Sequence, residues 1–170
     1  MSTIGPLLSR GRIDVRQKCT DDQTWIEQTL RERWGNVKVV SNGVVHDGGA
    51  IEALVAVIEG RRSGLLTYQA AVRDCEVVSL DAIEQWGGIG TALLEAMAAI
   101  GRQRGWRRLH LVTTNDNIDA LRFYQRRAWK ISAINVDAIA QARLLKPSIP
   151  LTGSYDIPIR DEIELEYVLS

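Results

Sequence analysis

Apolar side chains recur at helical spacing in one long segment of the chain, and this pattern is the strongest structural signal in the sequence. Over 89–104 the apolar positions recur in steps of three and one, which places them on one helical face. They are Ile89, Ala92, Leu93, Ala96, Met97 and Ile100. Weaker patterns predict two further helices, over 23–34 and 117–127.

Alternating and short apolar runs predict a set of β-strands around these helices. The predicted strands cover 13–18, 37–40, 51–59, 64–71, 75–80, 109–113, 131–136 and 163–169. Only short connections join the three central strands, which favours an antiparallel meander. A glycine-rich turn is expected over 43–49, and a long loop containing three prolines over 146–160.

The order of the elements predicts the fold class. It runs strand, helix, four strands, helix, strand, helix and two strands, which is typical of an α/β or α+β protein. We therefore expect a single mixed, mostly antiparallel twisted sheet flanked by helices. Because 170 residues is the usual size of one domain, we assign 1–170 to a single domain.

Charge and composition narrow the classes of function. The 21 basic and 21 acidic residues give a formal net charge of zero, which argues against a nucleic-acid or anionic-membrane partner. No apolar run approaches the roughly 20 residues that cross a bilayer, and no secretion signal is visible. Cys19 and Cys75 lie outside any metal-binding pattern, so we expect both to be buried in a reducing compartment. The expectation is a cytoplasmic protein without a metal.

A glycine-rich segment lies directly before the 89–104 helix. Its sequence is Gln85-Trp86-Gly87-Gly88-Ile89-Gly90-Thr91. The first N–H groups of a helix lack partners within the helix and lie at the positive end of its dipole, so such a turn can bind a pyrophosphate. Glycine removes a Cβ that would block close approach, and it permits positive φ. A turn that serves packing alone is the competing interpretation.

Two common nucleotide-binding patterns do not fit this segment. A Walker loop requires a lysine after its last glycine, and none follows here. A dinucleotide fingerprint requires a third glycine at the position where this chain has Leu93. The turn therefore predicts an anion site of another kind.

Asn117 and Tyr124 are a second pair of candidate residues. They lie seven positions apart on a predicted helix, which is about two turns, and so share one face. An asparagine amide can both donate and accept hydrogen bonds to a ligand rich in amides. A tyrosine can donate a proton to a leaving thiolate. The alternatives are a helix N-cap for Asn117 and a core aromatic for Tyr124.

Together the two segments resemble the GCN5-related N-acetyltransferase (GNAT) superfamily. The family's first signature, Q/R-x-x-G-x-G/A, matches 85–90, and its second signature matches part of 117–129. The positions that match the second signature are Asn117, Ala120, Phe123 and Tyr124, followed by Ala128-Trp129 where the family usually has Gly-Phe. The order of strands and helices over 13–169 is also similar, so the resemblance implies the GNAT fold.

The resemblance implies acetyl-CoA as the acyl donor and an amine of a small molecule or a protein as the acceptor, with direct attack in a ternary complex. Backbone N–H groups of the glycine turn would hold the pyrophosphate, and the strand edge at Leu80 would bind the pantetheine arm. The implied cofactor-binding residues are Leu80, Gln85, Gly88, Ile89, Gly90, Thr91 and Asn117. Tyr124 would protonate the departing thiolate.

The acceptor amine must lose a proton, since a free alkyl amine has a pKa of about 10.4. Glu76 is the first candidate for the base and Asp81 the second, with an ordered water as another route. Residues five apart on a regular strand point to opposite faces, so both can face one side only if the strand contains a bulge. Surface carboxylates are the alternative interpretation. We expect structural roles for His46 and His110, which have no evident partner in the sequence.

A second class of function is a non-catalytic CoA-binding sensor or regulatory module. Tyr124 favours the enzyme, because a protein that only binds CoA needs no proton donor at that position. The exposed edges expected of an open sheet also predict pairing into a homodimer. No motif identifies the acceptor.

Overall fold

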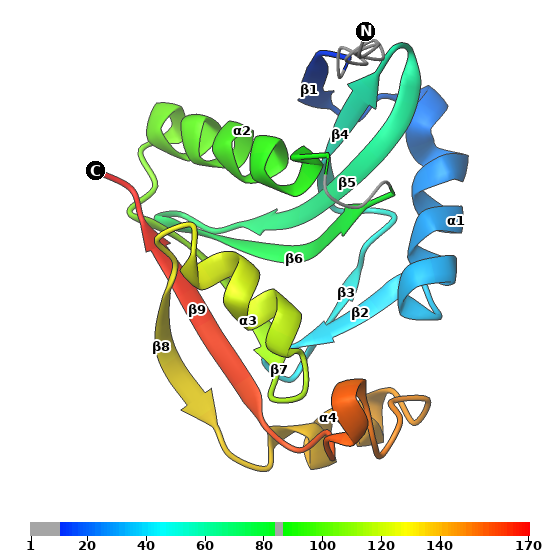
Figure 1. Ribbon diagram of the computed structural model, residues 1–170, viewed down its shortest axis with the longest axis vertical. Coiled ribbons are helices and arrows are strands. Elements are labelled where there is room, and N and C mark those ends of the chain that lie inside the picture. Colours follow the sequence, from blue (N-terminus) through cyan, green and yellow to red (C-terminus); the bar gives the residue numbers. More distant parts are fainter. Residues whose placement is uncertain (1–10, 84–86) are drawn as a thin grey trace, which may run out of the picture.

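A computed structural model describes residues 11–83 and 87–170 of the chain (Figure 1). Seven strands form one sheet in the order β1-β4-β5-β6-β7-β9-β8. Their bounds are β1 Ile13–Gln17, β4 Glu52–Ile58, β5 Arg61–Ala70, β6 Asp74–Ala82, β7 Arg108–Thr114, β8 Lys130–Asn135 and β9 Glu162–Val168. Strands β6 and β7 are parallel, and the other neighbouring pairs are antiparallel. The predicted mixed, mostly antiparallel sheet is confirmed.

Helices flank this sheet, with α1 and α2 on opposite sides of the central strands (Figure 1). Their bounds are α1 Gln23–Trp34, α2 Ile89–Arg104, α3 Ile118–Gln125 and α4 Ala138–Leu145. The first three confirm the predicted helices, whereas α4 was not predicted. It follows β8 almost directly, and Asp137 turns the chain between them with a φ of 59°, a conformation that Asp signals less clearly than Gly. Within the described residues, no helix is long and apolar enough to cross a membrane.

The segment expected as a turn over 43–49 contains a strand instead. Strands β2 (Lys38–Ser41) and β3 (Val44–Asp47) form an antiparallel hairpin outside the main sheet. Asn42 and Gly43 make its two-residue loop with φ values of 49° and 72°, the conformation for which Asn-Gly pairs are preferred in tight hairpins. The prediction was wrong for β3, since this loop is only two residues long.

Two apolar clusters lie on opposite faces of the central strands. Leu54 and Leu66 pack against α2, and their neighbours Ala53 and Leu65 pack against α1. This alternation is what the pleat of a strand requires, because successive side chains point to opposite faces. The cluster beneath α2 also includes Tyr124 of α3. Helices α2 and α3 therefore cover the same face of the sheet.

A buried carboxylate joins the start of α1 to two strands. Asp22 is fully buried and accepts hydrogen bonds from Arg16 at 2.6 and 3.0 Å and from Arg62 at 2.7 Å. The Arg16 guanidinium beside it holds the pKa of the Asp22 carboxyl well below its usual range. Cys19, which contacts this carboxylate, is exposed, so its predicted burial was wrong. Cys75 is buried as predicted, and burial raises the pKa of its thiol to about 12.

Candidate functional site

Strands β6 and β7 separate part of the way along their length. They are paired only where Asp74–Glu76 lies beside Arg108–His110. Beyond these pairs, β6 continues to Ala82 and β7 to Thr114 while the two strands diverge (Figure 1). The divergence leaves the part of β6 beyond Glu76 without a β7 partner on that edge. Leu80, predicted to contact the cofactor, lies on this part of β6.

The helix α2 begins beside Leu80 of β6. Gly88 is its N-cap with a φ of 80°, a conformation that L side chains rarely adopt, so the expected need for glycine is confirmed at this position. At Gly90 the structure gives another reason for glycine, because an added Cβ would lie 3.0 Å from Cζ of Phe123 and 3.9 Å from Leu80. Ile89 is buried beneath the helix. The predicted contribution of Gln85 lies outside the described residues.

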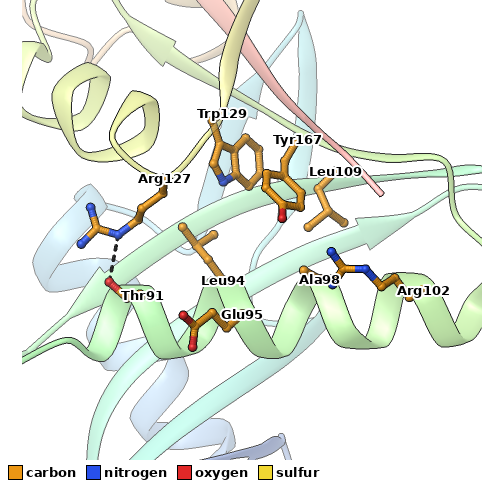
Figure 2. Close-up of a pocket in the computed structure, with 9 residues that line it drawn as sticks. All are labelled: Thr91, Leu94, Glu95, Ala98, Arg102, Leu109, Arg127, Trp129 and Tyr167. Atoms are coloured by element: carbon orange, nitrogen blue, oxygen red, sulfur yellow. Dashed lines mark hydrogen bonds between the residues drawn. The ribbon is translucent and has the colours of Figure 1, made fainter. Parts of the chain in front are cut away.

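Thr91, another predicted cofactor contact, lies on the first turn of α2 and binds a neighbouring arginine. Arg127 Nε donates to Thr91 Oγ1 at 2.9 Å (Figure 2). The Arg127 guanidinium also lies 3.7 Å from the centre of the Phe123 ring. A cavity of about 300 Å³ extends from the contact between Thr91 and Arg127 along α2. Its lining residues are Thr91, Leu94, Glu95, Ala98, Arg102, Leu109, Arg127, Trp129 and Tyr167. Glu76, Asn117 and Tyr124 do not line it.

Asn117 and Tyr124 occupy the two ends of α3. Asn117 is the N-cap, and its side-chain oxygen accepts a hydrogen bond from Ala120 N at 3.2 Å. The predicted cap is therefore present, and it leaves the Asn117 amide nitrogen free of that bond. Tyr124 is 8% exposed and packs between the rings of Phe123 and Trp129, at centroid distances of 5.2 and 5.5 Å. This burial is compatible with Tyr124 as a proton donor and with Tyr124 as a core aromatic.

The surroundings of Tyr124 keep its phenol protonated. Burial raises its pKa, and the negative charge of Asp81 raises it further. Within the described part of the chain, no group makes a hydrogen bond with the Tyr124 hydroxyl. The hydroxyl can therefore donate a hydrogen bond to an incoming group at neutral pH.

A bulge in β6 decides where its carboxylates point. Val77 pairs with Tyr68 and Ser79 pairs with Thr67, so Val78 is an extra residue in β6. The bulge shifts the alternation by one, and Glu76 and Asp81 consequently face the same side. Both side chains make their contacts with segments on the α1 side of the sheet. This is the arrangement that a regular strand excludes.

Glu76 is held by the β2–β3 hairpin. Ser41 Oγ donates a hydrogen bond to Glu76 Oε1, and His46 Nε2 lies 3.6 Å from Glu76 Oε2. Glu162, at the start of β9, is 4% exposed; burial and the charge of Glu76 raise its pKa, while the backbone N–H of Asn42 opposes that rise. Sequence reasoning missed this group, because its members lie in three separate parts of the chain.

Asp81, the second candidate for the base, is bound to α1. Trp34 Nε1 donates to Asp81 Oδ2 at 2.9 Å. Burial raises the pKa of the Asp81 carboxyl, and the hydrogen bond from Trp34 partly opposes this. Asp81 thus has a structural partner on the last turn of α1, whereas Glu76 faces an imidazole.

The loop over 146–160 is held against the β7–α3 junction. Asp116, 5% exposed, accepts hydrogen bonds from Thr114 Oγ1 and from Ser154 N. Asn115 accepts from the backbone N–H groups of Arg160 and Asp161 at 2.9 and 3.0 Å. Asn115 and Asp116 therefore position this loop next to Asn117. Across the described residues, no three His, Cys, Asp or Glu side chains gather in a way that could hold a metal ion.

The sequence is similar to that of known proteins. Residues 54–129 match the model of the acetyltransferase (GNAT) family. The uncharacterized protein YxbD of Bacillus subtilis (strain 168) is 35% identical over 154 residues, which cover 90% of this chain and 97% of YxbD.

Solved structures share the fold at lower identity. The IAA acetyltransferase from Bacillus cereus ATCC 14579 has a TM-score of 0.71 and 20% identity, covering 93% of this chain and 100% of the other. A GNAT family acetyltransferase from Elizabethkingia anophelis with acetyl-CoA bound has a TM-score of 0.65 and 17% identity, covering 92% and 98%. The family match, the relative and the overall fold lead to one conclusion: the chain belongs to the GNAT family of acetyltransferases.

Proposed function

We propose that this protein is an N-acetyltransferase that moves an acetyl group from acetyl-CoA to an amine in a ternary complex. One observation carries the proposal: where β6 and β7 stop pairing, α2 and Tyr124 lie on one face of the sheet and Glu76 on the other. A donor and an acceptor can approach this part of β6 from opposite faces. The acetyl group would then lie between a protonated phenol and a carboxylate.

The donor side has the features that a CoA thioester requires. When bound, acetyl-CoA supplies an activated acetyl group. Backbone N–H groups from Gly88 to Thr91 would hold its pyrophosphate, with Gln85 beside them by the family resemblance. The β6 edge at Leu80 offers backbone groups to the amides of the pantetheine arm. The Asn117 side-chain nitrogen adds a donor, since only its oxygen is used in the cap.

Tyr124 would act on the leaving sulfur. Its raised pKa keeps the phenol protonated, but the same shift makes complete proton transfer to a thiolate less favourable. We therefore assign Tyr124 a hydrogen bond to the sulfur as negative charge develops there. The stabilisation is made in the transition state and lowers the barrier selectively.

Glu76 would remove the proton of the acceptor amine. It lies on the face of β6 opposite to α2 and is oriented by the hydrogen bond from Ser41. Asp81 faces the same side, but its carboxylate accepts the Trp34 indole N–H, so we place it in a supporting role. The acceptor would approach across the face of β6 that carries both carboxylates.

Isothermal titration with acetyl-CoA, using ATP and NAD as controls, is the first test. We expect selective binding on the order of micromolar, followed by release of free CoA thiol when primary amines are added. Binding of acetyl-CoA without transfer to any amine would favour the non-catalytic CoA-binding module instead. A folded protein that binds no acetyl-CoA would refute both functions.

A further inference from the structure

The Nε2 atom of a histidine faces Glu76 without a hydrogen-bond partner among the described residues. His46 lies on β3, is 8% exposed, and its Nε2 is buried without a hydrogen-bond partner among the described residues. The atom that it approaches is Glu76 Oε2, at 3.6 Å. Buried polar atoms are usually hydrogen-bonded, so an unpaired imidazole nitrogen beside a carboxylate calls for an explanation.

The titratable groups around this pair come from two other strands of the fold, β9 and β7. Glu162 lies at the start of β9, and its pKa is raised by burial and by the charge of Glu76. His110 on β7 is the register partner of Glu76 and also carries an unpaired nitrogen, Nδ1. The hairpin adds Ser41, whose hydroxyl occupies the other oxygen of Glu76. Because Ser41 occupies Oε1, Oε2 is the carboxylate oxygen that faces His46.

Proton affinities show why a carboxylate alone is a poor acceptor for this reaction. A primary alkyl ammonium has a pKa of about 10.4, a glutamate about 4.3 and an imidazole about 6.5. Transfer from the ammonium to the carboxylate spans about six pKa units, and transfer to an imidazole spans about four. A carboxylate that can pass its proton to a neighbouring imidazole thus reduces the imbalance.

We propose that His46 is a positioning and relay residue for an acceptor that is a primary alkyl amine, receiving at Nε2 the proton that Glu76 takes from the amine. This inference rests on the proposed function. In the complete step, the ammonium gives one proton to Glu76 and its nitrogen attacks the thioester carbonyl carbon. The C–N bond forms, the C–S bond breaks, and the electron pair leaves with the sulfur. The amide nitrogen releases a second proton to solvent, and His46 returns the first one there.

The test compares wild type with His46→Gln in acetyl transfer to a panel of primary alkyl amines, measured as release of CoA thiol. We expect His46→Gln to lower kcat about 10- to 100-fold at pH 7. Between pH 7 and 9 the free-amine fraction rises about 100-fold, so the deficit of the variant should shrink as the need for a proton acceptor falls. A merely structural role for His46 would give a deficit that is independent of pH.

Two further variants guard against misfolding. His46→Asn provides a smaller amide at the same site, and Val44→Gln changes an exposed position of the same strand. We expect both to bind acetyl-CoA as the wild type does, His46→Asn to show the same pH-dependent deficit, and Val44→Gln to keep normal kcat. The relay is overturned if folded His46 variants keep wild-type kcat or lose it equally at every pH. Failure of the wild type to acetylate any amine refutes the proposed function and the relay with it.

Discussion

The two faces of β6 are built from different parts of the chain. On the α2 side, Leu80, Gly90 and Phe123 pack together within a continuous stretch that the family match over 54–129 contains. On the α1 side, Glu76 and Asp81 are held by polar side chains of the first 46 residues, and Glu76 interacts with Glu162 near the end of the chain. The face that we propose for the donor is local in sequence, and the face that we propose for the acceptor is assembled from distant segments.

This difference explains what a family resemblance can teach about a GNAT protein. A motif describes residues that are near each other in the chain, so it describes the donor face well. The hairpin residues Ser41 and His46 lie outside 54–129, as does Glu162. The identity of the acceptor is therefore to be sought in segments for which the family signatures carry no information.

Tyr124→Phe is expected to have the largest effect on the donor face. Loss of the hydroxyl removes the hydrogen bond to the leaving sulfur, and kcat should fall about 100-fold. Affinity for acetyl-CoA should stay within about twofold, because the ring packing is retained. Steady-state kinetics and calorimetry measure the two quantities separately. An unchanged kcat would remove Tyr124 from the chemistry and leave it as a core aromatic.

Asp22→Asn tests the polar construction of the α1 side. Breaking a buried carboxylate–guanidinium pair costs about 3–5 kcal/mol, and because Arg16 and Arg62 are partly exposed we expect about 2 kcal/mol at pH 7. The folded pKa of Asp22 is depressed, so its contribution is present above the unfolded pKa of about 3.9 and is lost on acidification.

Urea unfolding at pH 7 and pH 3 checks the sign of this effect. The stability difference between wild type and Asp22→Asn should narrow by about 1 kcal/mol at pH 3, since the unfolded carboxyl is then largely protonated. Asp21→Asn, one residue away and exposed, is the matched control. A difference that widens on acidification would contradict the assignment.

Gly90→Ala distinguishes two reasons for the glycine turn. A Cβ there would press on the Phe123 ring, so we expect a loss of about 1 kcal/mol in unfolding free energy, partly offset by better helix propensity. Combining it with Phe123→Leu should restore stability, measured by thermal unfolding. Any acetyl-CoA affinity that Gly90→Ala loses should return as well, measured by calorimetry. Affinity that stays low in the double variant would instead mean that the Cβ obstructs the cofactor.

Asp116→Asn should have the smallest effect. The two carboxylate oxygens of Asp116 accept one hydrogen bond each, from Thr114 and from Ser154, whereas the amide of Asn has a single oxygen. Loss of one of these bonds should lower the free energy of unfolding by about 1 kcal/mol. Faster hydrogen exchange at Ser154 N should report the loosened loop, with acceptor preference altered more than acetyl-CoA affinity. Asp156→Asn, in the exposed turn of the same loop, serves as the control. Equal losses for both ligands would make the loop purely structural.

The sequence predicted the fold where hydrophobic periodicity is strong. Helix 89–104 was predicted with its observed bounds, and the meander of β4, β5 and β6 was recognised from its short connections. The β2–β3 hairpin was missed even though the Asn42-Gly43 pair between valines is a direct hairpin signal. The three glycines of 43–49 favoured one long turn over a two-residue loop.

The site was predictable only as far as it is local. Asn117, Tyr124 and the glycine turn follow from spacing along single helices. The contacts of Glu76 with Ser41 and His46 span 35 and 30 residues, and no local pattern reports them. Long-range polar contacts depend on tertiary packing, which propensity and periodicity do not encode.

The extra residue at Val78 has a consequence for comparing relatives. Even-numbered residues of β6 before Val78 and odd-numbered residues after it point to the same face of the sheet. Glu76 therefore has the same orientation as Ser79 and Asp81. An alignment that places no gap at Val78 when a relative has a regular strand would match an inward carboxylate with an outward apolar residue. Counting acidic residues column by column would then misjudge which relatives share this chain's chemistry.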